Sequence, residues 1–345
     1  MEAALNDLIR NTRDNSQVDK HRNKNITHVN FFPHQQFFSV RRDKLSDFWE
    51  GYCNLVYKGQ GNYGLAEMNE RDMPVVTLMT FQFNSENVGE DDVFTDKFVV
   101  ELVNAFQQSI KDKIYLSDEK HELVCFVLES ENSWEEGKSA FFQVRLQFPF
   151  CRTETSVISK IREKAIGVLR RRNSFKELKV SPENDWEKII SPHTHLEPLP
   201  LYKSTKTNNK PKMVLTAIYD EFSEDNFRNG TVPTLRIGDD LFNPTWHQHV
   251  TQGLVDQDVF IDETGRAPHK KDHLFWLPMI LSVNYSGIIA LPKGEDDNNT
   301  DDRPLLEGLS GYDEEGSDLD KARFFLQFLK PERRTDFFSW RDVGA

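Results

Sequence analysis

A run of cations in the middle of the chain is the first set of residues whose type and spacing suggest chemistry. Within residues 154–172 apolar residues recur at helical spacing, and Lys and Arg occupy much of the remaining face. The cations of the run are Lys160, Arg162, Lys164, Arg170, Arg171, Arg172, Lys176 and Lys179. Such a helix suits a phosphate backbone, because affinity for nucleic acid comes mainly from Lys and Arg that neutralise phosphates. The alternative is a solvated helix face whose cations are neutralised by neighbouring Asp and Glu.

Two His-x-His pairs are the next candidates for chemistry. His193 and His195 form one pair, and His247 and His249 form the other. On a strand, each pair would present both imidazoles on one face, and four such ligands would suit Zn²⁺ or another transition metal. The pairs are far apart in the sequence and lack the closed Cys/His spacing of structural zinc sites. We therefore predict no metal site from them.

The cysteines give no support for a nucleophilic enzyme. Cys53, Cys125 and Cys151 are odd in number and widely spaced, which predicts neither a disulfide framework nor a Cys-x-x-Cys zinc site and favours a reducing compartment. No Gly-x-Ser-x-Gly elbow is present, and Cys125 and Cys151 lie in apolar, strand-like segments typical of inert buried cysteines. The chain also shows no secretory signal and no long apolar span, so we expect neither secretion nor a membrane span.

Length and charge limit the classes of protein that the chain can represent. With 345 residues, of which 37% are hydrophobic, it can bury a substantial core and form two or three subdomains. The formal net charge of -13 argues against a protein that coats nucleic acid over its whole surface. Binding to nucleic acid would have to be local.

The elements that would hold these residues alternate between strands and helices. The apolar patterns predict, in chain order, a strand and a helix within 28–57, a strand at 75–83, a helix at 98–110, strands at 122–129 and 139–150 around a polar loop at 130–138, and the cationic helix at 154–172. A second mixed segment ends near Leu291. This order predicts an α+β fold.

The composition divides the chain into four parts. These are an N-terminal helix and arm (1–28), a folded body (29–292), an acidic linker (293–318) and a C-terminal helical segment (319–345). The linker is rich in Asp, Glu, Asn and Gly and offers little apolar surface to bury.

Four segments, taken in order, resemble the N-terminal region of the primase-helicases of nucleocytoplasmic large DNA viruses, especially the iridovirus-like branch. They are His28-Val29 with Phe48-Trp49-Glu50-Gly51-Tyr52-Cys53, then Gly64-Leu65-Ala66-Glu67 leading into Met73-Pro74-Val75-Val76, then Phe275-Trp276-Leu277-Pro278-Met279-Ile280-Leu281-Ser282, and last Pro331-Glu332-Arg333-Arg334 with Trp340-Arg341-Asp342-Val343-Gly344. The resemblance covers nearly the whole chain. It implies an archaeo-eukaryotic primase-like fold, in which a small α/β unit joins a module like the RNA-recognition (RRM) fold, followed here by the C-terminal helical extension.

The resemblance also implies catalytic positions, and this sequence departs from the family pattern at each of them. The family's metal-binding Asp-x-Asp falls on Leu78 and Thr80, or on Thr80 and Gln82 in a register shifted by two residues. The family's phosphate-contacting His falls on Arg145, which can still bind phosphate, and its third-motif Asp falls on Ser191. Two-metal catalysis needs carboxylate ligands, so we expect no bound metal at these positions. No Gly-x-x-x-x-Gly-Lys-Ser/Thr loop is present either, which excludes ATP-driven unwinding by this chain alone.

The leading hypothesis is a catalytically degraded primase-like domain that acts in DNA replication as a nucleic-acid-binding or scaffolding element. Its expected partners are single-stranded or primed DNA, through Arg145 and the cationic run, and replication proteins. It would need no cofactor, and a viral origin would place it in the host cytoplasm or nucleus. One alternative is an active primase or nucleotidyltransferase whose Mg²⁺ ligands are not aligned, with Asp256, Asp258 and Asp262 as candidates. Another is a protein-interaction module for a replication partner.

Overall fold

The computed structural model describes most of the first two-thirds of the chain. The described residues are 2–13, 26–32, 35–41, 44–58, 63–69, 72–88, 93–117, 119–207, 210–219, 234–236, 277–284, 288–289 and 291–293. They belong to one compact unit, Met1–Gly294, and a second unit, Glu295–Ala345, lies outside them. The expected acidic linker and C-terminal helix therefore fall almost entirely outside the described residues. None of the described helices has the length and apolar character needed to cross a lipid bilayer.

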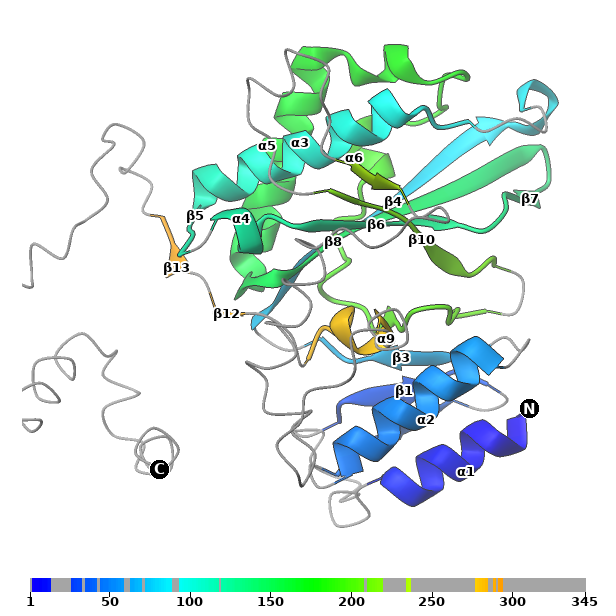
Figure 1. Ribbon diagram of the computed structural model, residues 1–345. Helices are drawn as coiled ribbons and strands as arrows, with labels where there is room; N and C mark the ends of the chain where they lie inside the picture. Colours follow the sequence, from blue (N-terminus) through cyan, green and yellow to red (C-terminus); the bar gives the residue numbers. More distant parts are fainter. Residues whose placement is uncertain are drawn as a thin grey trace, which may run out of the picture. The chain divides into compact units, whose positions relative to one another are not determined.

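A large, mainly antiparallel sheet forms the centre of the unit (Figure 1). Its strands are β4 (Asp72–Asn84), β6 (Cys125–Ser130), β7 (Trp134–Glu136), β8 (Ser139–Glu154), β10 (Met213–Tyr219), β11 (Thr234–Arg236) and β12 (Ile288–Ile289). The order is β11-β10-β6-β8, with β4 on the other side of β8 along most of its length. The strands β7 and β12 pair with the two ends of β8, and only β12 is parallel to it.

Two long helices cover one face of this sheet. They are α3 (Asp96–Lys113) and α5 (Thr155–Arg172), which pack side by side (Figure 1). The strand β4 alternates, so that Met79, Phe81 and Phe83 are fully buried while the intervening residues are half-exposed. These buried residues join the apolar sides of both helices in one core. The large sheet and the two helices therefore form a two-layer unit.

A smaller sheet with its own helices lies on the other side (Figure 1). Its strands, in the order β2-β1-β3-β9, are β2 (Gln36–Phe38), β1 (His28–Asn30), β3 (Leu65–Glu67) and β9 (Leu199–Pro200), and its helices are α1 (Glu2–Thr12) and α2 (Leu45–Lys58). The aromatic residues Phe48, Trp49 and Tyr52 of α2 are fully buried in a second core. That core also contains Phe126 and Leu128 of the large sheet, so both sheets share it.

Several short elements connect these layers. They are the 3₁₀ segments η3 (Ser85–Asn87) and η4 (Ser174–Glu177), the helices α4 (Glu119–Glu122), α6 (Trp186–Ile189) and α9 (Leu277–Ile280), and the strands β5 (Ile114–Tyr115) and β13 (Leu291–Pro292). Figure 1 shows α9 between the large sheet and the small sheet.

The mixed α+β class predicted from sequence is confirmed, and two local predictions are corrected. Residues 130–138 are not only a polar loop, because β7 pairs with β8 and the ring of Trp134 stacks on Phe141 at 5.5 Å. His193 and His195 lie in a turn instead of a strand, so the two imidazoles do not share a strand face. The strands and helices expected over residues 75–83, 98–110, 122–129, 139–150 and 154–172 are present, with ends that shift by a few residues.

Candidate functional site

Three positions at which the resemblance implies primase motifs are neighbours in the structure. Leu78 on β4 is the direct cross-strand partner of Arg145 on β8. On the other side of β4, the backbone N–H of Ser191 donates to the Leu78 carbonyl oxygen at 3.0 Å, next to a bridge between Met79 and Ile190. These residues, called the Leu78 row below (Leu78, Arg145 and Ser191), come from three distant parts of the sequence. The fold therefore places three residues that are distant in the sequence next to one another.

The side chains beside the Leu78 row are amides and hydroxyls. Thr80 accepts a hydrogen bond from Nε2 of Gln143 at 3.0 Å. Gln82 donates to the Ser139 hydroxyl at 2.9 Å and to one carboxylate oxygen of Glu183 at 3.2 Å. Within the part of the chain that the structure describes, no three His, Cys, Asp or Glu side chains gather in a way that could hold a metal. Because Mg²⁺ prefers several oxygen ligands with carboxylates among them, these residues do not fit a two-metal centre.

Arg145 is buried, with an exposed fraction of 2%. Its Nε and Nη2 donate to Oε1 of Gln147 at 3.1 and 2.5 Å, and its Nη1 donates to the Pro200 carbonyl at 2.8 Å. Burial lowers the pKa of Arg145 to about 10, and the nearby Glu67 acts against this shift. The guanidinium thus stays charged at neutral pH, although no described carboxylate lies within ion-pair distance. In this arrangement the guanidinium is bound to groups of the protein interior. A phosphate would have to displace the Pro200 carbonyl to bind it.

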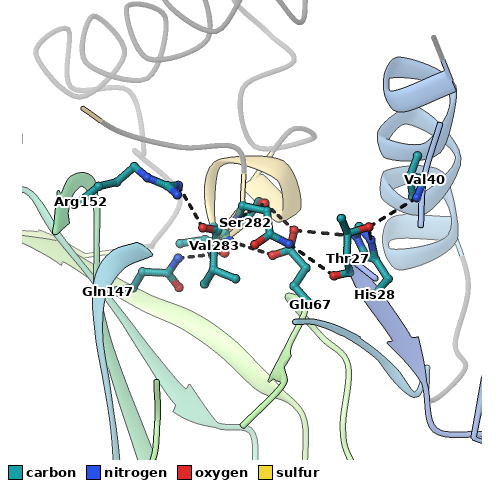
Figure 2. A network of polar contacts seen from close by, with 10 residues as sticks. Thr27, His28, Val40, Glu67, Gln147, Arg152, Ser282 and Val283 are labelled. Carbon is teal, nitrogen blue, oxygen red and sulfur yellow. Dashed lines mark hydrogen bonds and ion pairs between the residues drawn. The ribbon is translucent and has the colours of Figure 1, made fainter. Parts of the chain in front are cut away.

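A buried carboxylate, Glu67, is the centre of the polar contacts in Figure 2. One of its oxygens accepts from the Ser282 hydroxyl at 2.6 Å, and the other accepts from the Val283 backbone N–H at 2.7 Å. Desolvation by burial raises the pKa of Glu67 from 4.5 to about 7, although both hydrogen bonds and the charges of Arg145 and Arg152 oppose the rise. Glu67 is therefore partly protonated near neutral pH.

His28 lies against the same carboxylate and is fully buried. Its Nδ1 lies 2.8 Å from the Thr27 hydroxyl, and its Nε2 lies 3.8 Å from Oε1 of Glu67. Burial lowers the pKa of His28 to about 3. The imidazole is uncharged at neutral pH, so the contact with Glu67 is not an ion pair.

Polar side chains of the large sheet donate hydrogen bonds to residues 281–283, the segment that follows α9 (Figure 2). Nε2 of Gln147 donates to the Leu281 carbonyl at 2.8 Å, and Nη1 of Arg152 donates to the Val283 carbonyl at 3.0 Å. Residues 281–283 are thus bound by Glu67 of the small sheet and by β8 of the large sheet. Three of the four segments that carry the primase resemblance meet here, so they share a structural role in joining the two sheets.

Sequence reasoning gave no functional or structural role to Glu67, Gln147 or Arg152. Gln147 alternates with Leu146 and Phe148, so the apolar pattern assigns it to the opposite face of its strand, yet Gln147, Glu67 and Arg152 are all buried. The partners of such residues are set by tertiary contacts and cannot be found from the local pattern.

The cations of the predicted run fall into two groups. Several meet carboxylates or an amide of neighbouring elements: Lys164 with Asp112 at 3.0 Å, Arg162 and Arg170 with Glu187 at 3.1 and 3.3 Å, Lys176 with Glu177 at 3.8 Å, and Arg172 with the amide of Gln108 at 3.1 Å. Lys160 is exposed and also interacts with another residue, whereas Arg171 and Lys179 are exposed and form no ion pair with a described residue. On α5, the positions of Lys160, Lys164 and Arg171 form one stripe, because they are spaced by four and seven residues. The cations with acidic or amide partners thus support a neutralised surface, and the cations without an ion pair support phosphate contact.

The helix α5 and the cross-strand pair Leu78 and Arg145 lie on different sides of the large sheet, whereas Ser191 lies at the edge of β4 beside Arg162 of α5. The apolar side of α5 packs with Met79 and Phe81, whereas Leu78 packs against the core shared with the small sheet. Arg145 is therefore not part of the same surface as the cationic stripe.

The remaining candidates of the sequence analysis form no site within the described residues. His193 is exposed and His195 is half-buried, and burial lowers the pKa of His195 with a smaller effect from His193. His247, His249, Asp256, Asp258 and Asp262 lie outside the described residues. Cys53, Cys125 and Cys151 are free thiols in buried positions, and burial raises their pKa values.

Comparison with known proteins gives one family. No curated protein matches the chain. The family described as "C962R protein N-terminal AEP domain" matches residues 27–219, which is more than half of the chain. The matched range begins next to His28 and ends with β10, so it includes the Leu78 row, Glu67 and α5. The chain therefore belongs to the archaeo-eukaryotic primase family whose domains form the N-terminal part of C962R-type viral primase-helicases.

Proposed function

We propose that this chain is a catalytically degraded primase-like domain that binds DNA and acts as a binding or scaffolding element in DNA replication. The observation that carries the proposal is the Leu78 row. A working centre of this family needs carboxylates there, and Leu78, Thr80 and Ser191 supply none. The loss of the metal ligands leaves the fold available for binding without nucleotide transfer.

The proposal includes an RRM-like module in the large sheet. The succession β4, α3, β6, β8, α5 follows the first five elements of a β-α-β-β-α-β unit. The sixth element would lie beside β4, where the chain makes the single bridge between Met79 and Ile190. We interpret this bridge as a fourth strand reduced to one residue pair. The C-terminal helical extension remains a prediction, because it lies outside the described residues.

The cationic stripe on α5 supports DNA binding. Its ion pair between Lys164 and Asp112 is exposed on both sides, and exposed pairs of this kind contribute about 0–1 kcal/mol. A phosphate can therefore replace Asp112 at little cost, while Arg171 has no ion-pair partner among the described residues. In an acidic chain, binding through so few cations would be weak and sensitive to salt.

The test is a titration of the purified protein with Mg²⁺ or Mn²⁺ in the presence of nucleotides and a primed single-stranded template, followed for binding and for primer extension. We expect metal-independent binding at low salt and no extension, with and without a chelator. Metal-dependent extension would overturn the proposal and favour an active nucleotidyltransferase with ligands outside the described residues. The absence of any affinity at low salt would favour a protein-interaction module. A reducing location in the host cytoplasm or nucleus remains a prediction that the free cysteines support.

A further inference from the structure

A small recess lies between β4, α5 and the turn that contains Ser191 and His195. Its volume is about 10 Å³, which is room for one water-sized group. Its apolar floor includes Val75, Phe106 and Ile158. The polar residues of its lining, called the rim below, are Thr77, Ser159, Arg162, Ser191, Thr194 and His195. A group bound here would contact hydroxyls, a guanidinium and an imidazole.

Arg162 is held in one orientation at this rim. Its Nε and Nη2 donate to the Ile190 carbonyl at 3.0 and 2.8 Å, and Nη2 also donates to the Glu187 carbonyl at 2.9 Å. Its Nη1 makes no hydrogen bond within the described part of the chain. A fixed guanidinium with an unused amino group is a preorganised donor for an anion.

Two further donors lie at the rim. The Ser191 hydroxyl oxygen accepts from the His193 backbone N–H at 3.2 Å, which leaves its own hydrogen available to donate. The ring of His195 makes no hydrogen bond to a described residue and carries one N–H when neutral. Ser159 and Thr194 are engaged instead, because their hydroxyls donate to the carbonyls of Thr155 and Ser191 at 3.4 Å.

The charges around the recess also favour an anion. Glu187 is shared by Arg162 and Arg170, at 3.1 and 3.3 Å, so the three side chains together carry one excess positive charge. We propose that the mouth of this recess binds one phosphate group of a nucleic-acid strand through Arg162, Ser191 and His195. This inference rests on the proposed function and adds a specific contact to it.

The identity of residue 191 is decisive for this site. Ser191 occupies the position at which the primase resemblance implies an Asp. A carboxylate at that position would repel a phosphate that is not bridged by a metal, whereas a hydroxyl can donate to it. The replacement that removes a metal ligand therefore also makes direct phosphate binding possible.

Two variants of the same shape test the proposal. Ser191→Asp adds a negative charge at the rim, and Ser191→Asn is its neutral control. Both side chains can still accept from the His193 N–H, so both variants should fold, which thermal unfolding checks. Binding of inorganic phosphate is followed by NMR of the His195 ring. Binding of a single-stranded oligonucleotide, with a 5′-phosphate or a 5′-hydroxyl, is followed by fluorescence anisotropy at low salt.

We expect Ser191→Asp to bind phosphate and DNA at least about tenfold more weakly than Ser191→Asn, because one charge-assisted contact is replaced by repulsion. A loss confined to the 5′-phosphorylated strand would identify a terminal phosphate, and an equal loss for both strands would identify an internal one. The proposal is wrong if both variants bind DNA equally, even if inorganic phosphate distinguishes them. Failure of the proposed function would look different, because the unmodified protein would then show no salt-sensitive affinity for DNA.

Discussion

At the scale of single residues, the ionisation of Glu67 affects the contacts that join the two sheets. The Glu67 carboxyl group holds its proton more tightly in the folded protein, where its pKa is about 7, than in the unfolded chain, where its pKa is 4.5. Glu67 therefore contributes stability that is fully present below pH 4.5 and is lost as the pH rises through about 7. His28 acts in the opposite sense, since its folded pKa of about 3 lies below the ordinary 6.5. Between about pH 4.5 and 6.5 the two effects offset each other.

The first prediction isolates the Glu67 effect with Glu67→Gln. Glutamine can accept from the Val283 N–H and has no proton to lose, so the variant should gain stability relative to the unmodified protein as the pH rises from 4.5 to above 7. The full difference across this interval is about 3 kcal/mol. Urea unfolding at several pH values measures it, with the exposed Glu50→Gln as control. A difference between Glu67→Gln and the unmodified protein that does not change with pH would contradict the assignment.

The second prediction separates an interior role of Arg145 from phosphate binding. Arg145→Met keeps much of the side-chain volume but leaves Gln147 Oε1 and the Pro200 carbonyl without their donor. We expect a loss of roughly 2–4 kcal/mol in the free energy of unfolding and unchanged DNA affinity of the folded protein. Exposed Arg171→Met should do the reverse, with stability within about 0.5 kcal/mol and weaker binding. Weaker DNA binding by Arg145→Met at unchanged stability would show that Arg145 reaches a phosphate.

At the scale of elements, the sequence pattern predicts those parts whose apolar period is long and uninterrupted. The helices α3 and α5 and the strands β4, β6 and β8 follow from the apolar pattern, because each contributes several buried apolar residues to a core. The strand β7 is missed, since it lies in a polar stretch and is defined by its pairing with β8, where Trp134 stacks on Phe141. The position of Ser191 beside Leu78 is likewise set by a single bridge that no local pattern encodes. The contacts of Glu67 that join the two sheets cannot be predicted from the local pattern, because the partners of Glu67 are distant in sequence.

The third prediction concerns the start of α3. Thr95 is its N-cap, where the hydroxyl accepts from the Phe98 N–H at 3.1 Å and donates to the Glu177 carbonyl at 3.0 Å. Thr95→Ala removes both contacts, so we expect a loss of about 1 kcal/mol in the free energy of unfolding. Thr95→Ser retains the hydroxyl and should lose much less. Hydrogen exchange at the first turn of α3 should rise only in the Ala variant, and a similar rise in both variants would argue against capping by this hydroxyl.

At the scale of the whole described unit, the cross-strand pair Leu78 and Arg145 and the cationic stripe of α5 lie on different sides of the large sheet. Leu78 faces the core that the sheet shares with α2, whereas Ser191 lies at the edge of β4 beside Arg162 of α5. Binding through Lys160, Lys164 and Arg171 would therefore not require Leu78 or Arg145. A chain of this fold could lack carboxylates at Leu78 and Thr80 and still bind DNA through α5, as we propose.

The last prediction tests whether that affinity is local or reflects net charge alone. Lys160→Glu with Arg171→Glu reverses two charges of the α5 stripe, and Arg10→Glu with Lys138→Glu reverses two exposed charges elsewhere, so both double variants have the same net charge. We expect roughly tenfold weaker binding per reversed site on α5, and a change of no more than about threefold in the control. The dependence of affinity on salt should become shallower only for the α5 variant. With fewer phosphate contacts, binding releases fewer counterions from the DNA. Equal losses in both variants would mean that the acidic chain as a whole, and not α5, governs the interaction with DNA.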